Sequence, residues 1–408
     1  MDRIGEADDR NPRRGASRKG RPTLRDVARE LGVSAQTVSN AFRRPDQLSP
    51  ALRSEVLRTA RRLGYGGPDP AAKSLRGGRA GALGVLYNDR LSHAFDDPAF
   101  MLFLRGLTAA VEQAGLSLLL IPAESPGSVD SDARQMHDEA SRGTRRPGAA
   151  ADRPFAALRT AVVDGIVVYS LPDDDPLYAT AASRNRPLVL VDSPRDRSFA
   201  RVTIDDEAAA RAAAEHLIGL GHRQLGVIAL ELTARRRFGP VEAERIAAAT
   251  NAMTAARLSG YAAAARAAGL APESVTVVET EANTEPEGER AARMLLGGDA
   301  RPTALLAMSD RLAVGAIAAA RELGLDIPGD VSVVGFDNVP ASASTTPPLT
   351  TVDQQHEAKG RQAGECLLAA LHDGDAADDS GTAAATAGAE LPARLVVRGS
   401  TGPSPRSR

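Results

Sequence analysis

The chain has few residues whose types and spacing could support catalysis or metal binding. None of its six histidines shows H-E-x-x-H or other metal-ligand spacing. The sequence also lacks the G-x-S-x-G turn of serine hydrolases and a phosphate-binding P-loop. These absences argue weakly against an enzyme, because unfamiliar active sites can be built from scattered residues. Two of the histidines, His216 and His222, are expected to be structural.

The most distinctive polar surface belongs to the stretch VSAQTVSNAF, residues 33–42. If this stretch is helical, its apolar residues can face a core, and its outward face carries Gln36 and Asn40 among small residues. Such a face holds no catalytic group. It can only donate and accept neutral hydrogen bonds.

Three short helices are predicted around this face. Thr23 is a candidate N-cap for the first, Ser34 for the second, and Ser49, followed by proline, for the third. A glycine separates the first two helices and Gly64 ends the third. Short helices joined by a tight glycine turn indicate a helix-turn-helix domain over residues 21–66.

Charge is divided unevenly along the chain. Residues 1–79 hold 18 Lys and Arg against 9 Asp and Glu, whereas the remainder holds 32 against 43. A basic N-terminal part on an acidic body suggests that the N-terminal part binds a polyanion and that the body repels it. Residues 1–20 are polar and basic without periodicity, so we expect a disordered tail; loose phosphate contacts are the alternative.

Residues 67–79 are punctuated by proline and glycine, which favours a linker. Their middle, 70–76, could form one or two helical turns. A helix of that length is not stable alone, because nucleation costs more than a few hydrogen bonds return. From the residues alone, the segment is a flexible linker.

From Gly81 onward, apolar stretches of strand length alternate with helical stretches. This alternation predicts an α/β fold with parallel sheets covered on both faces, in two doubly wound lobes with a ligand site at the carboxyl ends of the strands. Segments 123–152, 231–250 and 373–389 interrupt the rhythm. The expected strands are 81–87, 116–122, 164–170, 186–192, 223–230, 274–280, 303–309 and 331–337, and the expected helices are 99–114, 205–219, 253–268, 286–296 and 310–323.

Composition also bears on location. The single cysteine, Cys366, excludes an internal disulfide and fits a reducing cytoplasm. The N-terminus has no apolar region of the kind found in signal peptides, and no run of about 18 apolar residues could span a membrane. We therefore expect a cytoplasmic protein.

Several phrases, in order, resemble the LacI (lactose repressor) family of bacterial transcriptional regulators. They include TLRDVARELGVSAQTVSNAF, PDPAAKSLRGG, GHRQLGVIA, PTALLAMSDRLAVGAI, GLDIPGDVSVVGFDN and LVVRGST. The resemblance covers residues 23–401 apart from the three interruptions. It implies an all-α helix-turn-helix domain, a hinge helix at 67–79, and a core of the periplasmic-binding-protein type at 80–401. The implied N-lobe is about 80–203 plus 354–388, the C-lobe about 204–353 plus 389–401, and 402–408 is a tail.

The resemblance implies that the amide face reads DNA. In the family the second helix enters the major groove, where amides can pair with adenine edges, and a leucine of the hinge wedges into the minor groove. The corresponding positions are Ala35, Gln36 and Asn40 for bases, Thr23, Ser34 and Thr37 for phosphates, Leu75 for the wedge, and Lys73 and Arg76 for phosphates beside it.

The resemblance also implies an effector in the cleft between the lobes. Asp192 and Asp337 each end an apolar strand, and for each of them a helix cap or an inter-lobe ion pair is the alternative role. No stacked ring is expected at Asn283, where many members place an aromatic residue. Arg235 to Arg237 could help to bind an acidic ligand, and a solvated loop is the alternative. The positions that match effector contacts are Phe100, Asp192, Arg257, Asn283, Ser309 and Asp337.

Together these observations predict a homodimeric DNA-binding regulator without cofactor or metal, most simply a repressor. Its expected partners are a pseudo-palindromic double-stranded operator and a small effector, a carbohydrate or related metabolite. Two rivals are weaker. A secreted sugar receptor would lack the basic N-terminal part, and a nucleoside or sugar hydrolase would need a catalytic constellation that the sequence does not show.

Overall fold

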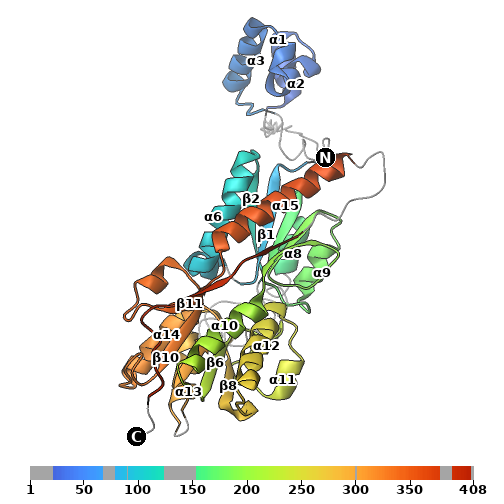
Figure 1. Cartoon of the computed structure of the whole chain (residues 1–408). Coiled ribbons are helices and arrows are strands. Elements are labelled where there is room, and N and C mark those ends of the chain that lie inside the picture. The colour runs from blue at the N-terminus through green and yellow to red at the C-terminus, as the bar shows by residue number, and fades with distance from the viewer. Residues whose placement is uncertain are drawn as a thin grey trace, which may run out of the picture. The chain divides into compact units, whose positions relative to one another are not determined.

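The computed structural model describes residues 22–67, 79–89, 91–123, 153–298, 301–376 and 388–405. They fall into two compact units that divide at Ala80 and Gly81 (Figure 1). The predicted tail 1–20, nearly all of the hinge, and most of the interruptions at 123–152 and 373–389 lie outside the described residues.

The N-terminal unit is the predicted set of three helices. They are α1 (Leu24–Leu31), α2 (Ala35–Arg43) and α3 (Pro50–Leu63), with the short helix η1 (Pro45–Gln47) after α2. The predicted caps are present: the hydroxyl oxygen of Ser34 accepts a hydrogen bond from the Thr37 amide at 3.0 Å, and that of Ser49 accepts one from the Leu52 amide at 3.3 Å. All three helices contribute to one small core, which contains Val27, Ala28, Val38, Ala41, Val56 and Ala60.

In the second unit, the N-lobe is built on a six-stranded, wholly parallel sheet in the order β12-β5-β4-β3-β1-β2. Helices α6 (Pro98–Gln113) and α15 (His356–Ala376) pack on one face, and α8 (Arg153–Thr160) and α9 (Pro176–Ala182) on the other. The strands are β1 (Ala82–Tyr87), β2 (Ser117–Pro122), β3 (Gly165–Tyr169), β4 (Leu188–Val191), β5 (Ala200–Ile204) and β12 (Ala389–Leu391). The short helix α5 (Leu91–Asp96) precedes α6.

The C-lobe is built on a seven-stranded sheet in the order β13-β11-β10-β9-β6-β8-β7, in which only β7 and β13 are antiparallel to their neighbours. Its strands are β6 (Leu225–Ala229), β7 (Gly239–Pro240), β8 (Val275–Glu279), β9 (Ala304–Ala307), β10 (Ser332–Asp337), β11 (Thr350–Asp353) and β13 (Arg394–Val396). Its helices are α10 (Asp206–Gly219), α11 (Ala243–Ala247), α12 (Ala252–Ala267), α13 (Glu285–Leu296), α14 (Asp310–Glu322), η2 (Pro272–Ser274) and η3 (Pro340–Ala343).

The eight expected strands and five expected helices of this unit are all present, within a few residues. Strand β12 corrects the predicted lobe boundary, because residues 389–391 pair with β5 in the N-lobe sheet and only 394–396 join the C-lobe sheet. Sequence alone could not separate these two short strands. Within the described residues the chain passes from one lobe's elements to the other's three times, after β5, after β11 and after β12. None of the helices described is long and apolar enough to cross a membrane.

Glycines let three helix pairs pack closely. Gly106 and Gly360 bring α6 against α15, Gly288 and Gly315 bring α13 against α14, and Gly260 brings α12 against α10. A Cβ atom at Gly260 would overlap the carbonyl oxygen of Glu207 on α10. The close approach therefore depends on the missing side chain.

Replacing Gly260 with alanine should lower the free energy of unfolding by about 1–3 kcal/mol, because the new methyl group overpacks the α10–α12 contact. Gly219→Ala is the matched control, since Gly219 is also helical and a Cβ there meets nothing within 4 Å. That variant should be neutral or stabilised by up to about 1 kcal/mol. Urea unfolding of both variants checks this. Equal stabilities would contradict the packing argument.

Candidate DNA-binding surface and effector cleft

The outward face of α2 carries a chain of hydrogen-bonded amides. The Nε2 atom of Gln36 donates to Oδ1 of Asn40 at 2.9 Å, and Nδ2 of Asn40 donates to Oε1 of Gln47 at 3.1 Å. Ala35 and Gln36 are exposed, and Asn40 is half-buried beside them. Gln47, which sequence reasoning missed, comes from η1 and orients the Asn40 amide.

The predicted phosphate-contacting residues lie at the N-termini of the first two helices. Ser34 caps α2, and its hydroxyl lies 2.8 Å from that of Thr37. Thr23 precedes α1, where its amide and hydroxyl both donate to the carboxylate of Asp26 at 2.9 and 2.7 Å. A helix N-terminus favours anions, so this arrangement is compatible with phosphate. The hinge residues Lys73, Leu75 and Arg76 lie outside the described residues.

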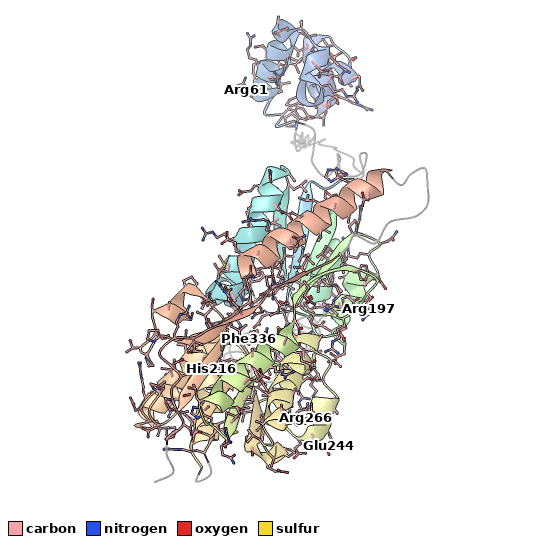
Figure 2. All side chains as sticks on the ribbon, viewed as in Figure 1. Arg61, Arg197, His216, Glu244, Arg266 and Phe336 are labelled. Atoms are coloured by element: carbon pink, nitrogen blue, oxygen red, sulfur yellow. The ribbon has the colours of Figure 1, made fainter. Side chains whose placement is uncertain are left out.

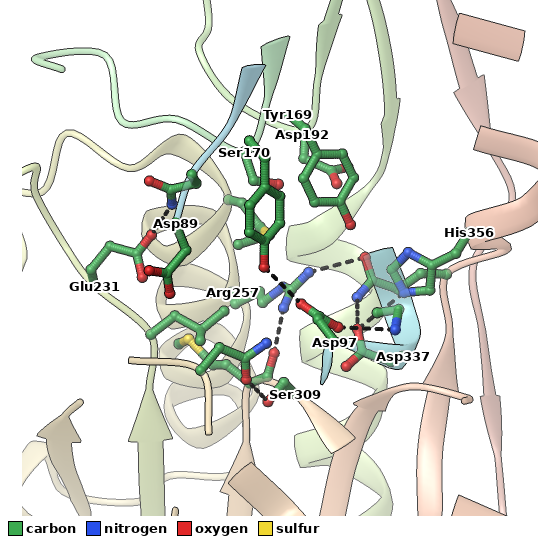
Figure 3. Close-up of a pocket in the computed structure, with 18 of the residues that line it drawn as sticks. Asp89, Asp97, Tyr169, Ser170, Asp192, Glu231, Arg257, Ser309, Asp337 and His356 are labelled. Carbon is green, nitrogen blue, oxygen red and sulfur yellow. Dashed lines mark hydrogen bonds and ion pairs between the residues drawn. The ribbon is translucent and has the colours of Figure 1, made fainter. Parts of the chain in front are cut away.

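A cavity of about 80 Å³, lined mostly by polar residues, lies between the two lobes of the second unit (Figure 3). This volume is smaller than that of the usual small-ligand site. Five of the six predicted effector residues line it: Asp192, Arg257, Asn283, Ser309 and Asp337. Lining residues that the sequence did not single out include Tyr87, Asp97, Tyr169, Gln354 and His356.

Phe100, the sixth predicted residue, is a core residue and does not line the cavity. It is fully buried, and its ring centroid lies 4.1 Å from that of Tyr87. The preceding residue, Ala99, reaches the cavity instead. The aromatic surface of the cavity comes from Tyr87 and Tyr169 of the N-lobe, which only the register of β1 against β3 brings together.

Arg257 is buried, and its donors are committed within the protein. Its Nε donates to Asp206 at 2.8 Å, Nη1 to the Met308 carbonyl at 2.7 Å, and Nη2 to Gln354 Oε1 at 3.1 Å. The guanidinium also lies over the ring of Phe336, 3.8 Å from its centroid. Arg257 therefore shapes the floor of the cavity and is not a free clamp for an acidic group.

Gln354 joins the charged groups of the two lobes. Its Oε1 accepts from Arg257 and, at 3.0 Å, from Nζ of Lys359, while its Nε2 donates to Asp337 at 2.7 Å. Lys359 is completely buried and also donates to Asp192 at 2.6 Å. Because Asp192 and Lys359 both belong to the N-lobe, the inter-lobe ion pair considered for this aspartate is not formed.

Asp337 does cap a helix, as the alternative reading of the sequence allowed. Its Oδ2 accepts from the Asp310 amide at 3.0 Å, at the start of α14, and its Oδ1 lies 3.1 Å from Nε2 of His356. Asp310 is buried next to it and accepts from the Val339 amide at 2.9 Å and from the Thr351 hydroxyl. Burial, together with the charge of Asp337, raises the pKa of Asp310 to about 7.

Two smaller features complete the cavity. Asp97 caps α6, accepting from the Ala99 and Phe100 amides at 3.0 and 3.3 Å, and burial raises its pKa. Opposite, the Ser309 hydroxyl caps α14 and donates to Oδ1 of Asn283 at 2.5 Å. A carboxylate on one wall and a small hydroxyl–amide pair on another suit a ligand with hydroxyl groups.

The interruption at 231–250 is largely an ordered arm on the edge of the C-lobe, not a solvated loop. It contains β7 and α11, and Arg245 holds buried Glu279 with two hydrogen bonds of 2.5 and 2.6 Å. Glu231 and Arg236 of this arm line the cavity, whereas Arg235 is exposed. The prediction of a solvated side chain matches Arg235 and Arg237, which are exposed, and fails for Arg236.

Comparisons with known proteins agree with this architecture. Residues 23–67 match the bacterial regulatory proteins of the lacI family, and residues 214–401 match the periplasmic binding protein-like domain. An HTH-type transcriptional regulator of Mycobacterium tuberculosis is 44% identical over 349 residues, which are 85% of this chain and 90% of that protein.

Two solved structures are similar over 93% of this chain. The lac repressor dimer bound to operator and the anti-inducer ONPF has a TM-score of 0.67, with 26% identity and 99% of that chain covered. The complex of the transcriptional regulator CelR with cellobiose has a TM-score of 0.60, also at 26% identity, with all of that chain covered.

Fold and site thus define a helix-turn-helix protein with a periplasmic-binding-protein-like core, which is a DNA-binding transcriptional regulator and not an enzyme. The chain belongs to the LacI family of bacterial regulatory proteins.

The raised pKa of Asp310 predicts a pH dependence of stability. As pH rises from the ordinary value of 3.8 towards about 7, the unfolded chain releases this proton before the folded chain does. The unfolding free energy of the wild type should therefore fall relative to Asp310→Asn, by at most about 1.4 kcal/mol per pH unit. Urea unfolding of both proteins between pH 4.5 and 7.5 measures the difference. A difference that does not vary with pH would contradict the assignment.

Proposed function

We propose that the protein is an operator-specific repressor whose binding to DNA is controlled by a small, polyhydroxylated effector in the cleft. The observation that carries the proposal is the chain of amides formed by Gln36 and Asn40 of α2 and Gln47 of η1, in the part of the chain that has an excess of basic residues. The chain acts as a homodimer in the cytoplasm, so its operator is a pseudo-palindrome with one half-site per α2 helix.

In this proposal Gln36 and Asn40 read base edges in the major groove, and Ala35 packs against a thymine methyl group. Thr23, Ser34 and Thr37 contact phosphates, which fix register without reading sequence. Lys73 and Arg76 contact phosphates in the hinge, and Leu75 enters the minor groove. These side chains give specificity by hydrogen bonding, and the surrounding lysines and arginines give affinity.

The effector proposal rests on the chemistry of the cavity. Carboxylates are good acceptors for hydroxyl groups, and Asp97, Asp192 and Asp337 supply them from both lobes. Arg257 is paired with Asp206, so its positive charge is already compensated within the protein and does not favour an acidic ligand. The similar regulator CelR has been solved with a bound sugar, cellobiose. A neutral carbohydrate or related polyol is the class of effector that we propose.

Regulation follows from the position of the cavity between the lobes. A ligand that contacts both lobes favours one angle between them over others, because it binds that arrangement better. The first residues of the core lead directly from the hinge, so a change in lobe angle in a dimer alters the spacing of the two hinges. We propose that this change shifts the population of dimers able to hold the operator.

DNA binding is tested with the full chain on its own promoter region. Gln36→Ala and Asn40→Ala should each cost about 1–3 kcal/mol of operator binding and alter preference at one base pair per half-site. Binding to random DNA should hardly change, because phosphate contacts dominate there. Gel-shift titrations on both DNAs measure this. If both variants lost affinity equally on specific and random DNA, the two amides would not be readers.

The effector site is tested with Asp337→Asn, after a thermal-shift screen of neutral sugars and polyols has found a ligand. Effector affinity should fall at least tenfold, about 1.4 kcal/mol, while operator affinity without effector stays near normal. Asp353→Asn is the control, because Asp353 pairs with Asp337 in strand register but does not line the cavity. Calorimetry measures the affinity of both variants for the effector. If Asp337→Asn bound the effector as tightly as the wild type, Asp337 would not belong to the site.

A further inference from the structure

The arm formed by residues 231–250 connects the C-lobe to the N-lobe beside the cavity. We propose that Arg236 of this arm, with Glu231 and Asn88, forms a clasp that holds the lobes together before any ligand binds. Its effect on effector affinity rests on the proposed function, whereas its effect on the lobe angle does not. No contact with the effector is required of Arg236, which acts as a positioning residue.

Arg236 bonds to both lobes at once. Its Nη2 donates to the carbonyl oxygen of Asn88 at 2.6 Å, and its Nη1 donates to that of Glu281 at 3.4 Å. Asn88 directly follows β1 of the N-lobe, and Glu281 follows β8 of the C-lobe. The guanidinium is also 3.7 Å from Oδ2 of Asp89 and 4.0 Å from Oε1 of Glu231.

A second bond reinforces the first. Nδ2 of Asn88 donates to Oε1 of Glu231 at 2.6 Å, so Asn88 is bound to the arm through both its main chain and its side chain. Glu231 also lies 3.4 Å from Nδ2 of Asn251. Figure 3 shows Asp89 and Glu231 on the same side of the cavity, away from Asp337 and His356.

Burial makes this contact strong. The side chain of Arg236 is 9% exposed, and so is that of Glu231. Breaking a buried pair leaves a charge without compensation, which costs far more than breaking an exposed pair. Opening the lobes at this side would separate Arg236 from Asn88 and Asp89 while Glu231 remains on the arm. The clasp therefore favours the closed arrangement.

The arm is too firmly held to move with the N-lobe when the lobes part. Arg245 fixes it to Glu279 of β8, and the Leu232 amide donates to the same carboxylate at 3.0 Å. Farther along, Asp174 of the N-lobe accepts from the Ala234 amide at 3.1 Å. The arm thus belongs to the C-lobe. When the two lobes move apart, the contacts between the arm and the N-lobe must break.

A clasp of this kind sets the fraction of molecules that are closed without ligand. If only the closed form binds effector well, apparent affinity falls in proportion when that fraction falls. Removing Arg236 should therefore weaken effector binding, and because Arg236 also lines the cavity, the lobe angles of the free protein distinguish this effect from a lost ligand contact. The same change should widen the distribution of lobe angles in the free protein, which can be measured without knowing the effector.

The test uses spin labels at Arg197→Cys in the N-lobe and Glu244→Cys in the C-lobe, both exposed and labelled in Figure 2. The native Cys366 is buried and should not take up label under native conditions. Electron-electron distance measurements on the full chain compare wild type, Arg236→Ala and Arg236→Lys. Arg235→Ala is the matched control, because the neighbouring arginine is exposed.

Arg236→Ala should broaden the distance distribution and shift it by several ångströms, and Arg236→Lys should restore it in part. Arg235→Ala should match wild type. Identical distributions for wild type and Arg236→Ala would overturn the clasp. Should Arg236→Ala fail to fold, Glu231→Gln, which removes one charge at nearly constant shape, takes its place with the same expected direction.

A gel shift of the wild type on its promoter separates this proposal from the proposed function. Operator binding with unchanged distances would refute only the clasp. Changed distances without operator binding would refute only the proposed function. With a ligand in hand from the thermal-shift screen, Arg236→Ala should also raise its dissociation constant at least threefold; an unchanged constant would contradict the link to affinity.

Discussion

The core depends on the compensation of charges buried between its two lobes. Asp192, Lys359, Asp337 and Arg257 would each be costly to bury alone, and the amide of Gln354 hydrogen-bonds to three of them. Because Gln354 directly follows β11, where the chain returns to the N-lobe, this amide lies at a crossover. The same few hydrogen bonds thus satisfy the charges and fix the geometry of the chain between the lobes.

This pairing of charges explains why the cavity is polar but offers a ligand little uncompensated charge. Carboxylates and cations line it together, and most of them are already paired. What remains for a ligand is a set of acceptor oxygens, the hydroxyl of Ser309 and the rings of Tyr87 and Tyr169. Such a surface distinguishes ligands by the positions of their hydroxyl groups, since each unsatisfied buried group has a cost.

In the N-terminal unit, side-chain amides again hydrogen-bond to one another, but here they lie on the surface. Its core is small, and three short helices are held by caps at Ser34 and Ser49 as well as by packing. The amides of Gln36, Asn40 and Gln47 lie outside that core and satisfy one another. A surface that is hydrogen-bonded before binding keeps its side chains ordered, which lowers the entropy lost when a partner replaces those bonds.

The sequence by itself determined the local elements. Periodicity, caps and glycine stops located the three N-terminal helices, and apolar runs located eight strands, because these signals act over a few neighbouring residues. Family phrases located five of the cavity residues. Short strands such as β12 and β13 carry too little pattern to be assigned, and their division between the two sheets depends on pairing partners far away in the chain.

Only the tertiary structure decided which groups meet. Phe100 lies in the core because α6 turns that face towards Tyr87. Arg257 forms an ion pair with Asp206, which lies 51 residues earlier in the chain. Arg236 and Arg235 are identical neighbours, yet one is buried between lobes and the other is exposed. Burial and charge pairing are set by long-range packing, so residue type and spacing cannot distinguish such a pair.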